Sequence, residues 1–434
     1  MAREFGSRPK ATAHWEGRRG LGVAMRDVEA RLDAATIANK LTGWRNEFSI
    51  LIGDLRRCSQ AGALAGAAQQ EETARMTLRP MSATAFALLG LLAAMPAVSE
   101  SLTYTGSELA AKGLRSDGKD GLEPAHDVSG IACLPPDAQG RRSCLVVNDQ
   151  DTYAQLARLD EERLQGGDLV FLIDKERRRT IHGRKPKRLG CSQGKGGFKD
   201  LDGEGVAYAA PYFYVVGSHG CARKDRTAVK SAFVLARLRV DPDGVPSSND
   251  FGSVETTWRL SEILRRDPVV GPHYGRDLDK EHDGLNIEGV AAIGDHLFFG
   301  LRAPSISGKA FVFAVRADGL FASGDAPSGA RGERIEIELG EGVGIRDLAA
   351  LDDGRLLILS GPTLQQPDIP FRVYAIELKS QARPELLTTL EDVSVGRDDR
   401  AKAEGILPLD GEARRFLILF DGLRNGGPRL YERR

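Results

Sequence analysis

Short hydrophobic runs alternate with turns along residues 127–422, and one arrangement occurs five times. Each copy opens with a polar or charged residue, usually followed by glycine. A small apolar run, a turn and an almost entirely apolar second run follow. The copies span residues 127–150, 203–220, 286–304, 344–362 and 402–422. Apolar runs of this length between turn signals are typical of strands buried on both faces. The pattern therefore predicts five hairpins packed between neighbours.

A third strand is predicted after every hairpin, and a fourth strand after four of the five. The third strands are expected at residues 153–160, 231–241, 309–319, 371–379 and 428–433. The fourth are expected at 168–174, 253–260, 333–339 and 385–390. Repeated units of about four strands indicate the blades of a β-propeller. We therefore expect an all-β fold with five blades. Six blades are the alternative if residues 160–199 contain a degenerate blade.

The last unit reaches Arg434 after only its third strand. Its expected partner is "ESLTYTGSEL" at residues 100–109, because a first strand paired into the last blade removes an exposed sheet edge. We therefore expect residues 100–434 to form a single propeller domain, closed by an N-terminal strand, and the protein to be a monomer.

The phrases "GLNIEGVA", "FFGLRAP", "GIRDLAAL" and "YVVGSHG" resemble a family of exported bacterial proteins of unknown function that are predicted to be β-propellers. The resemblance covers residues 125–432. More loosely, "DVSGIA" with "VVNDQ" is similar to the opening of secreted phytase-like and esterase-like propellers. The closer family implies the fold and brings no established activity.

The first hundred residues differ from the rest. A basic region begins at Met76, an apolar run covers residues 83–95, and small residues follow at 97–99. This is the layout of a secretory signal, so we expect residues 76–99 to be a signal peptide and the protein to be exported to the periplasm or beyond. The apolar run is too short for a permanent membrane span; a buried or interfacial helix is the alternative. We expect residues 1–75 to be a non-native or disordered extension.

Four cysteines follow residue 99, and an even number in an exported protein permits two disulfides. Cys133 and Cys144 lie on adjacent strands of the first predicted hairpin. Cys191 and Cys221 lie in the connections that enter and leave the second hairpin. We favour these two pairs, with free buried thiols as the alternative.

The charge is balanced, with 60 Lys and Arg against 61 Asp and Glu, so nucleic acid is not an expected partner.

The start of the first strand and the end of the second lie at the same end of an antiparallel hairpin. Charged residues at these positions should therefore share one face of the propeller. The strand-opening residues are Ser129, Glu204, Glu288, Arg346 and Glu404. The strand-closing pairs are 148–149, 218–219, 301–302, 360–361 and 420–421.

Opposite charges that converge in a concavity form a candidate site. In the catalytic hypothesis, Glu204, Glu288 and Glu404 hold a metal or orient water, and His219 or Asp149 transfers protons. The candidate substrate-binding residues are Arg302, Arg346, Asn148 and Asp421. The structural alternative is that the repeated glutamates accept backbone hydrogen bonds from the next blade, with Arg346 as an ion-pair partner.

Two acidic loops are candidate calcium sites, because hard cations prefer several oxygen ligands from one flexible loop. Their candidate ligands are Asp200, Asp202 and Glu204 in one loop, and Asp279, Glu281, Asp283 and Glu288 in the other. An EF-hand is excluded, since Val290 stands where the closing glutamate is required. Solvated acidic turns are the alternative.

The chain contains neither a G-x-S-x-G elbow nor an H-E-x-x-H motif. We therefore expect an exported propeller that binds, and in the catalytic version hydrolyses, an anionic small molecule such as a phosphate or other ester, with calcium as a candidate cofactor. The rival hypothesis is a non-catalytic module that binds a partner protein or a surface glycan.

Overall fold

The structure is a computed structural model that describes residues 104–118, 121–174, 181–187, 189–246, 252–325, 329–378, 383–396 and 399–434. The predicted extension over residues 1–75 and the predicted signal over 76–99 lie outside the described residues. In the part of the chain that is described, no helix is long and apolar enough to cross a membrane.

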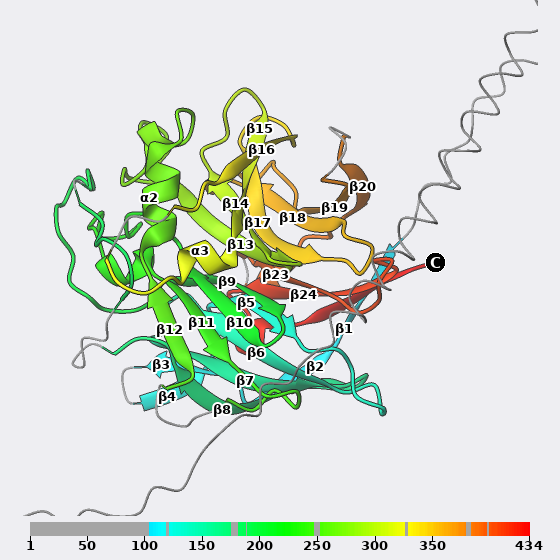
Figure 1. Cartoon of the computed structure of the whole chain (residues 1–434). Helices are drawn as coiled ribbons and strands as arrows, with labels where there is room; N and C mark the ends of the chain where they lie inside the picture. Colours follow the sequence, from blue (N-terminus) through cyan, green and yellow to red (C-terminus); the bar gives the residue numbers. More distant parts are fainter. Residues whose placement is uncertain are drawn as a thin grey trace, which may run out of the picture. The chain divides into compact units, whose positions relative to one another are not determined.

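Within these residues, five sheets stand around a common centre and form a five-bladed β-propeller (Figure 1). Blade 1 contains β5 (Val128–Cys133), β6 (Arg142–Asn148), β7 (Tyr153–Leu159) and β8 (Arg163–Phe171). Blade 2 contains β9 (Gly203–Ala209), β10 (Tyr212–Gly217), β11 (Leu235–Arg239) and β12 (Val254–Thr257). Blade 3 contains β13 (Asn286–Ile293), β14 (His296–Ala303), β15 (Lys309–Arg316) and β16 (Glu333–Glu338).

Blade 4 contains β17 (Val343–Ala350), β18 (Leu356–Pro362), β19 (Arg372–Ile376) and β20 (Glu385–Thr389). Blade 5 contains β23 (Lys402–Pro408), β24 (Arg415–Asp421), β25 (Arg429–Arg433) and β1 (Tyr104–Glu108). The predicted five-bladed fold is confirmed. The six-blade alternative is wrong, because the described part of 160–199 contributes β8 and otherwise irregular chain.

The ring closes as expected, because β1 pairs antiparallel with β25 from Tyr104↔Arg433 to Glu108↔Arg429. In Figure 1 the cyan β1 lies beside the red strands of blade 5. The chain then continues into β2 (Ala110–Lys112), which pairs parallel with β8 at the outer edge of blade 1. The hairpin of β3 (Arg115–Gly118) and β4 (Gly121–Pro124) follows. The start of the described chain therefore joins blade 5 to blade 1.

Hydrophobic clusters fill the boundaries between neighbouring blades, which explains why the second strands are apolar almost throughout. In β14, Leu297 and Phe299 belong to the cluster between blades 2 and 3, whereas Phe298 belongs to the cluster between blades 3 and 4. Successive side chains of a strand point to opposite faces of its sheet, so a strand that is buried between two neighbouring blades must be apolar on both faces.

Short helical segments lie outside the blades: η1 (Lys230–Phe233), α2 (Arg259–Arg266), η2 (Gly271–His273), α3 (Ala317–Leu320) and η3 (Arg424–Gly426). A small ribbon of β21 (Ser394–Val395) and β22 (Asp399–Arg400) precedes β23. Three predicted strands extend into residues that are helical. Residues 231–233 belong to η1 rather than to β11, residues 259–260 begin α2 rather than ending β12, and residues 317–319 belong to α3 rather than to β15.

Two disulfides join Cys133 to Cys144 and Cys191 to Cys221, the two pairs that the sequence favoured. Cys133 and Cys144 are directly opposite each other on β5 and β6. The second disulfide, with Cα atoms 5.7 Å apart, joins the connection before β9 to the connection after β10. Its two cysteines are buried.

Candidate functional site at the charged end of the channel

Every innermost strand contains one β-bulge near its start. The pairing between the first two strands of each blade skips one residue of the inner strand, and these residues are Ser129, Glu204, Glu288, Arg346 and Glu404. In blade 3 the pairing also skips Arg302 of β14. A bulge inserts one extra residue into a strand and redirects its side chain. These five residues, here called the bulge ring, are the strand-opening residues that the sequence singled out.

Glycines that follow three of these bulges allow neighbouring inner strands to approach closely. A Cβ atom on Gly130 would lie 3.0 Å from Gly205 Cα, and one on Gly205 would lie 2.9 Å from Val290 N. On Gly289 it would lie 2.6 Å from Leu348 N. The repeated Glu-Gly pair therefore combines a redirected carboxylate with a close contact between backbones.

Blade 4 has Asp347 where the other blades have this glycine. The Asp347 carboxylate accepts the backbone N–H of Leu348 and, across the blade boundary, that of Ile406, each at 2.8 Å. Burial raises the pKa of Asp347 well above its usual range. Asp347 thus provides a polar bridge between blades 4 and 5.

The bulge ring contains a chain of buried ion pairs. Arg302 Nη1 lies 2.5 Å from Glu288 Oε1, and Arg346 Nη2 lies 2.9 Å from Glu288 Oε2. Arg346 also pairs with Glu404. Burial alone would raise the pKa of Glu288, but Arg302, Arg346 and Arg223 outweigh it and hold that pKa below its usual value. Burial raises the pKa of Glu404 to about 7, and Arg346 offsets this only in part.

The two ring-associated arginines differ in the donors that they have left. Arg302 also donates to the carbonyls of Thr363 at 2.7 Å and Leu364 at 3.3 Å, so each of its three nitrogens has a partner. Arg346 has two buried nitrogens, Nε and Nη1, without a hydrogen-bond partner. Both arginines connect neighbouring parts of the ring, but only Arg346 has donors that remain unpaired.

The side of the channel formed by blades 1 and 2 is acidic, and we call Asp149, Asp202 and Glu204 the acidic side. Glu204 is 8% exposed, and its carboxylate has no hydrogen bond or ion pair with any described residue. Burial, reinforced by Glu288 and Asp202, raises its pKa well above the usual range. Burial and the charge of Asp202 raise the pKa of Asp149 to about 9. Burial likewise raises the pKa of Asp202 to about 6, although Ser218 donates a hydrogen bond to it.

A basic pocket of about 470 Å³ opens beside the bulge ring. We call it the mouth pocket; its lining is Arg223, Leu278, Lys280, Arg302 and residues 364–368. Burial would lower the pKa of Arg223, but Glu288, Glu404, Glu204 and Asp202 outweigh it and raise that pKa. Sequence reasoning missed Arg223. Its position two residues after Cys221, in the connection assigned to this face, was the available signal.

Three of the predicted site residues have their own partners outside the chain of ion pairs. His219 is fully buried, with its ring centroid 6.0 Å from that of Phe233 and its Nδ1 2.9 Å from the carbonyl of Gly217. Burial lowers its pKa to about 4, so it is neutral at neutral pH. Asn148 donates to Arg115 O and Asp151 Oδ2, and Asp421 forms an ion pair with Lys402.

The predicted calcium ligands do not form one cluster. Asp279 Oδ1 accepts the backbone N–H groups of Glu281 and His282, which is a turn interaction. Among the described residues, the groups close enough to share an ion are Asp277 with Asp279 and His282, and Asp277 with the disulfide-bonded Cys191 and Cys221. The acidic side belongs to neither group.

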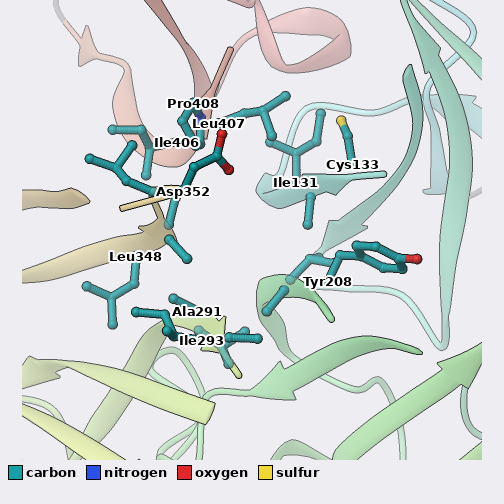
Figure 2. Close-up of a pocket in the computed structure, with 18 of the residues that line it drawn as sticks. Ile131, Cys133, Tyr208, Ala291, Ile293, Leu348, Asp352, Ile406, Leu407 and Pro408 are labelled. Atoms are coloured by element: carbon teal, nitrogen blue, oxygen red, sulfur yellow. The ribbon is translucent and has the colours of Figure 1, made fainter. Parts of the chain in front are cut away.

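A second pocket, also of about 470 Å³, lies at the opposite ends of the inner strands (Figure 2). Its walls come from all five blades and include Ile131, Tyr208, Ile293, Leu348 and Ile406. Asp352 is one of its few charged side chains. This second pocket was not predicted from the sequence, although the apolar second halves of the inner strands indicate its character.

The fold and the charged channel end define a five-bladed β-propeller with a polar site at its centre. The chain belongs to the family of proteins of unknown function DUF3616, whose model matches residues 195–242 and 245–429. This agrees with the resemblance found in the sequence. No curated protein matches the chain.

Several solved structures are similar to it. A gluconolactonase from Xanthomonas campestris is 12% identical, with a TM-score of 0.32 over 72% of this chain and 89% of that one. A PQQ-bound aldose sugar dehydrogenase from Streptomyces coelicolor is 16% identical, with a TM-score of 0.31 over 76% and 99%. A protein from Lactobacillus plantarum is 14% identical, with a TM-score of 0.30 over 69% of this chain. The match spans 66% of that protein, just under two thirds of its length. These similarities do not identify an activity.

Proposed function

We propose that the mouth pocket binds a small anionic molecule, such as a phosphate ester or a carboxylate. The observation that carries this proposal is the charge of the pocket lining. It contains three cationic side chains, Arg223, Lys280 and Arg302, and one carboxylate, that of Asp368. Neither Arg223 nor Lys280 has a hydrogen bond or salt bridge with the described residues. Both cations are therefore available to an anion through charge-assisted hydrogen bonds.

The spare donors of Arg346 support the same proposal. Its Nε and Nη1 atoms are buried and unpaired, and such groups usually bind water or a ligand. Arg302 connects the two regions, because it lines the mouth pocket and pairs with Glu288 of the bulge ring. An anion held by Arg223 and Lys280 would thus lie close to the ring.

Hydrolysis of a bound ester is the catalytic form of this proposal. A general acid or base works best when its pKa lies near the operating pH. Glu404, with a pKa of about 7, and Asp202, with a pKa of about 6, meet this condition. Phosphate and carboxylic esters are therefore the substrates to assay first, with and without calcium. The two disulfides support export, since such bonds persist in oxidising compartments.

Calorimetric titration with inorganic phosphate tests the binding proposal. We expect saturable binding by the wild type and at least a tenfold weaker affinity for Arg223→Ala. Lys224→Ala is the matched control, because Lys224 is exposed and adjacent in sequence but is not part of the pocket lining. Its affinity should stay within about twofold of the wild type. Absence of phosphate and acetate binding, or equal losses in both variants, would contradict the proposal.

A further inference from the structure

The charged end of the channel contains groups of both signs. Arg223, Lys280 and Arg302 line the mouth pocket, and Arg346 pairs with Glu288, which also pairs with Arg302. The acidic side lies on blades 1 and 2, and Arg223, in the connection after β10, also belongs to blade 2. Two of the ring glutamates, Glu288 and Glu404, form ion pairs with Arg302 and Arg346. Among the described residues, no carboxylate of the acidic side forms an ion pair, although Asp202 accepts a hydrogen bond from Ser218.

Glu204 shows this imbalance most clearly. It is the skipped residue of the bulge in β9, is 8% exposed, and has no hydrogen bond or ion pair with the described residues. Asp149 adds a buried oxygen, Oδ1, that also has no hydrogen-bond partner. An ionised carboxylate removed from water without a partner is costly, so it either holds a proton, as the raised pKa of Glu204 and of Asp149 indicates for the unliganded protein, or binds a cationic ligand.

An organic ammonium group fits this place better than a metal ion. A calcium ion needs several oxygens within about 2.3–2.6 Å of one point. The carboxylates of the acidic side are not among the described groups whose ligand atoms approach closely enough to share an ion. An ammonium group has three donors and can interact with carboxylates that are farther apart.

We propose that the ligand of this propeller is a small zwitterion, whose anionic group binds Arg223 and Lys280 in the mouth pocket and whose ammonium group binds Glu204 and Asp149. This inference rests on the proposed anion-binding function and names the class of its ligand. The bridge between the two regions is Arg302, which contacts both the pocket and the bulge ring.

Three matched probes test the inference in the folded full-length protein: O-phosphoethanolamine, ethyl phosphate, which lacks the ammonium group, and ethanolamine, which lacks the phosphate. Titrations contain EDTA to exclude metal ions. The wild type should bind O-phosphoethanolamine at least tenfold more tightly than ethyl phosphate. Glu204→Gln should bind the two phosphates with about equal affinity, and its affinity for ethyl phosphate should match that of the wild type. Glu161→Gln, the same substitution at an exposed position, should keep the preference.

The outcomes separate this inference from the proposed function. If the wild type binds O-phosphoethanolamine and ethyl phosphate with equal affinity, the inference of a zwitterionic ligand is wrong and the proposal of anion binding still stands. Affinity for ethyl phosphate that rises at least tenfold with calcium and falls with EDTA overturns it in favour of a metal ion. Binding of none of the three probes contradicts both proposals. If Glu204→Gln does not fold, Asp149→Asn replaces it, and the wild-type comparison of the probes still decides.

Discussion

The guanidinium of Arg346 lies 2.9 Å from Glu288 across the boundary between blades 3 and 4, and the same group pairs with Glu404 of blade 5. A single side chain therefore connects three blades at the centre of the ring. The contact is buried, so water cannot replace Arg346 as a partner for the two glutamates.

Replacement of Arg346 by leucine should strongly destabilise the propeller. Removal of one member of a buried ion pair leaves uncompensated charge and costs about 3–5 kcal/mol. Urea unfolding at neutral pH measures this loss. Arg316→Leu is the control, because Arg316 is exposed and ion pairs between exposed side chains contribute little to stability. Similar urea midpoints for the two variants would show that Arg346 does not stabilise the propeller.

The Asp347 bridge should be sensitive to loss of its acceptor. Asp347→Ala leaves the N–H of Ile406 without its partner, which costs about 1–3 kcal/mol. Asp347→Asn keeps one acceptor oxygen and should cost less. Thermal unfolding of the two variants checks the order, and an alanine variant as stable as the asparagine variant would contradict it.

Asp149 should make the unliganded protein less stable as the pH rises. Its folded pKa of about 9 exceeds the usual value of 3.8, so the folded state holds a proton that the unfolded state has lost. This contribution is fully present below about pH 4 and is lost as the pH rises towards 9. Melting temperatures measured across this window should fall more steeply for the wild type than for Asp149→Asn. Parallel profiles would contradict the assignment.

The two disulfides should differ in their effect on anion binding. Cys191–Cys221 holds the connection that carries Arg223, whereas Cys133 lines the pocket at the opposite end of the channel. The double variant Cys191→Ser/Cys221→Ser should therefore bind phosphate at least fivefold more weakly. The double variant Cys133→Ser/Cys144→Ser should lose stability but keep its affinity. The reverse pattern would show that the Cys191–Cys221 bond does not position Arg223.

The backbone contact at Gly205 should not tolerate a methyl group. The added Cβ would lie 2.9 Å from Val290 N, a backbone atom of the next blade, and overpacking of this kind costs about 1–3 kcal/mol. Gly329→Ala is the control, because no atom lies within 4 Å of its added Cβ. Urea midpoints compare the two variants, and an unchanged midpoint for Gly205→Ala would show that the strands can separate without cost.

Hydrophobic patterning predicted the blades because each second strand is buried between two others. Phe298 and Phe299 of β14 show this, since they pack into different blade boundaries. The position of Glu288 and Arg302 at one end of their hairpin was predictable for the same reason: antiparallel pairing places them there. Which carboxylate is neutralised was not predictable, because it depends on guanidinium positions in three blades.

His219 illustrates the limit of this reasoning. It was expected to close the second strand, but β10 ends at Gly217 and His219 adopts a left-handed φ of 53°. The side chain then packs against Phe233 instead of joining the charged cluster. Arg223 was missed for the opposite reason: it lies in an irregular connection, where no periodicity indicates the direction of a side chain.

A crystal structure of the protein with O-phosphoethanolamine tests the central claim most directly. We predict that the phosphate lies between Arg223 and Lys280, with the ammonium group directed towards Glu204. A phosphate bound in the apolar pocket at the opposite end of the channel, or no ligand in the mouth pocket at saturating concentration, would contradict the account.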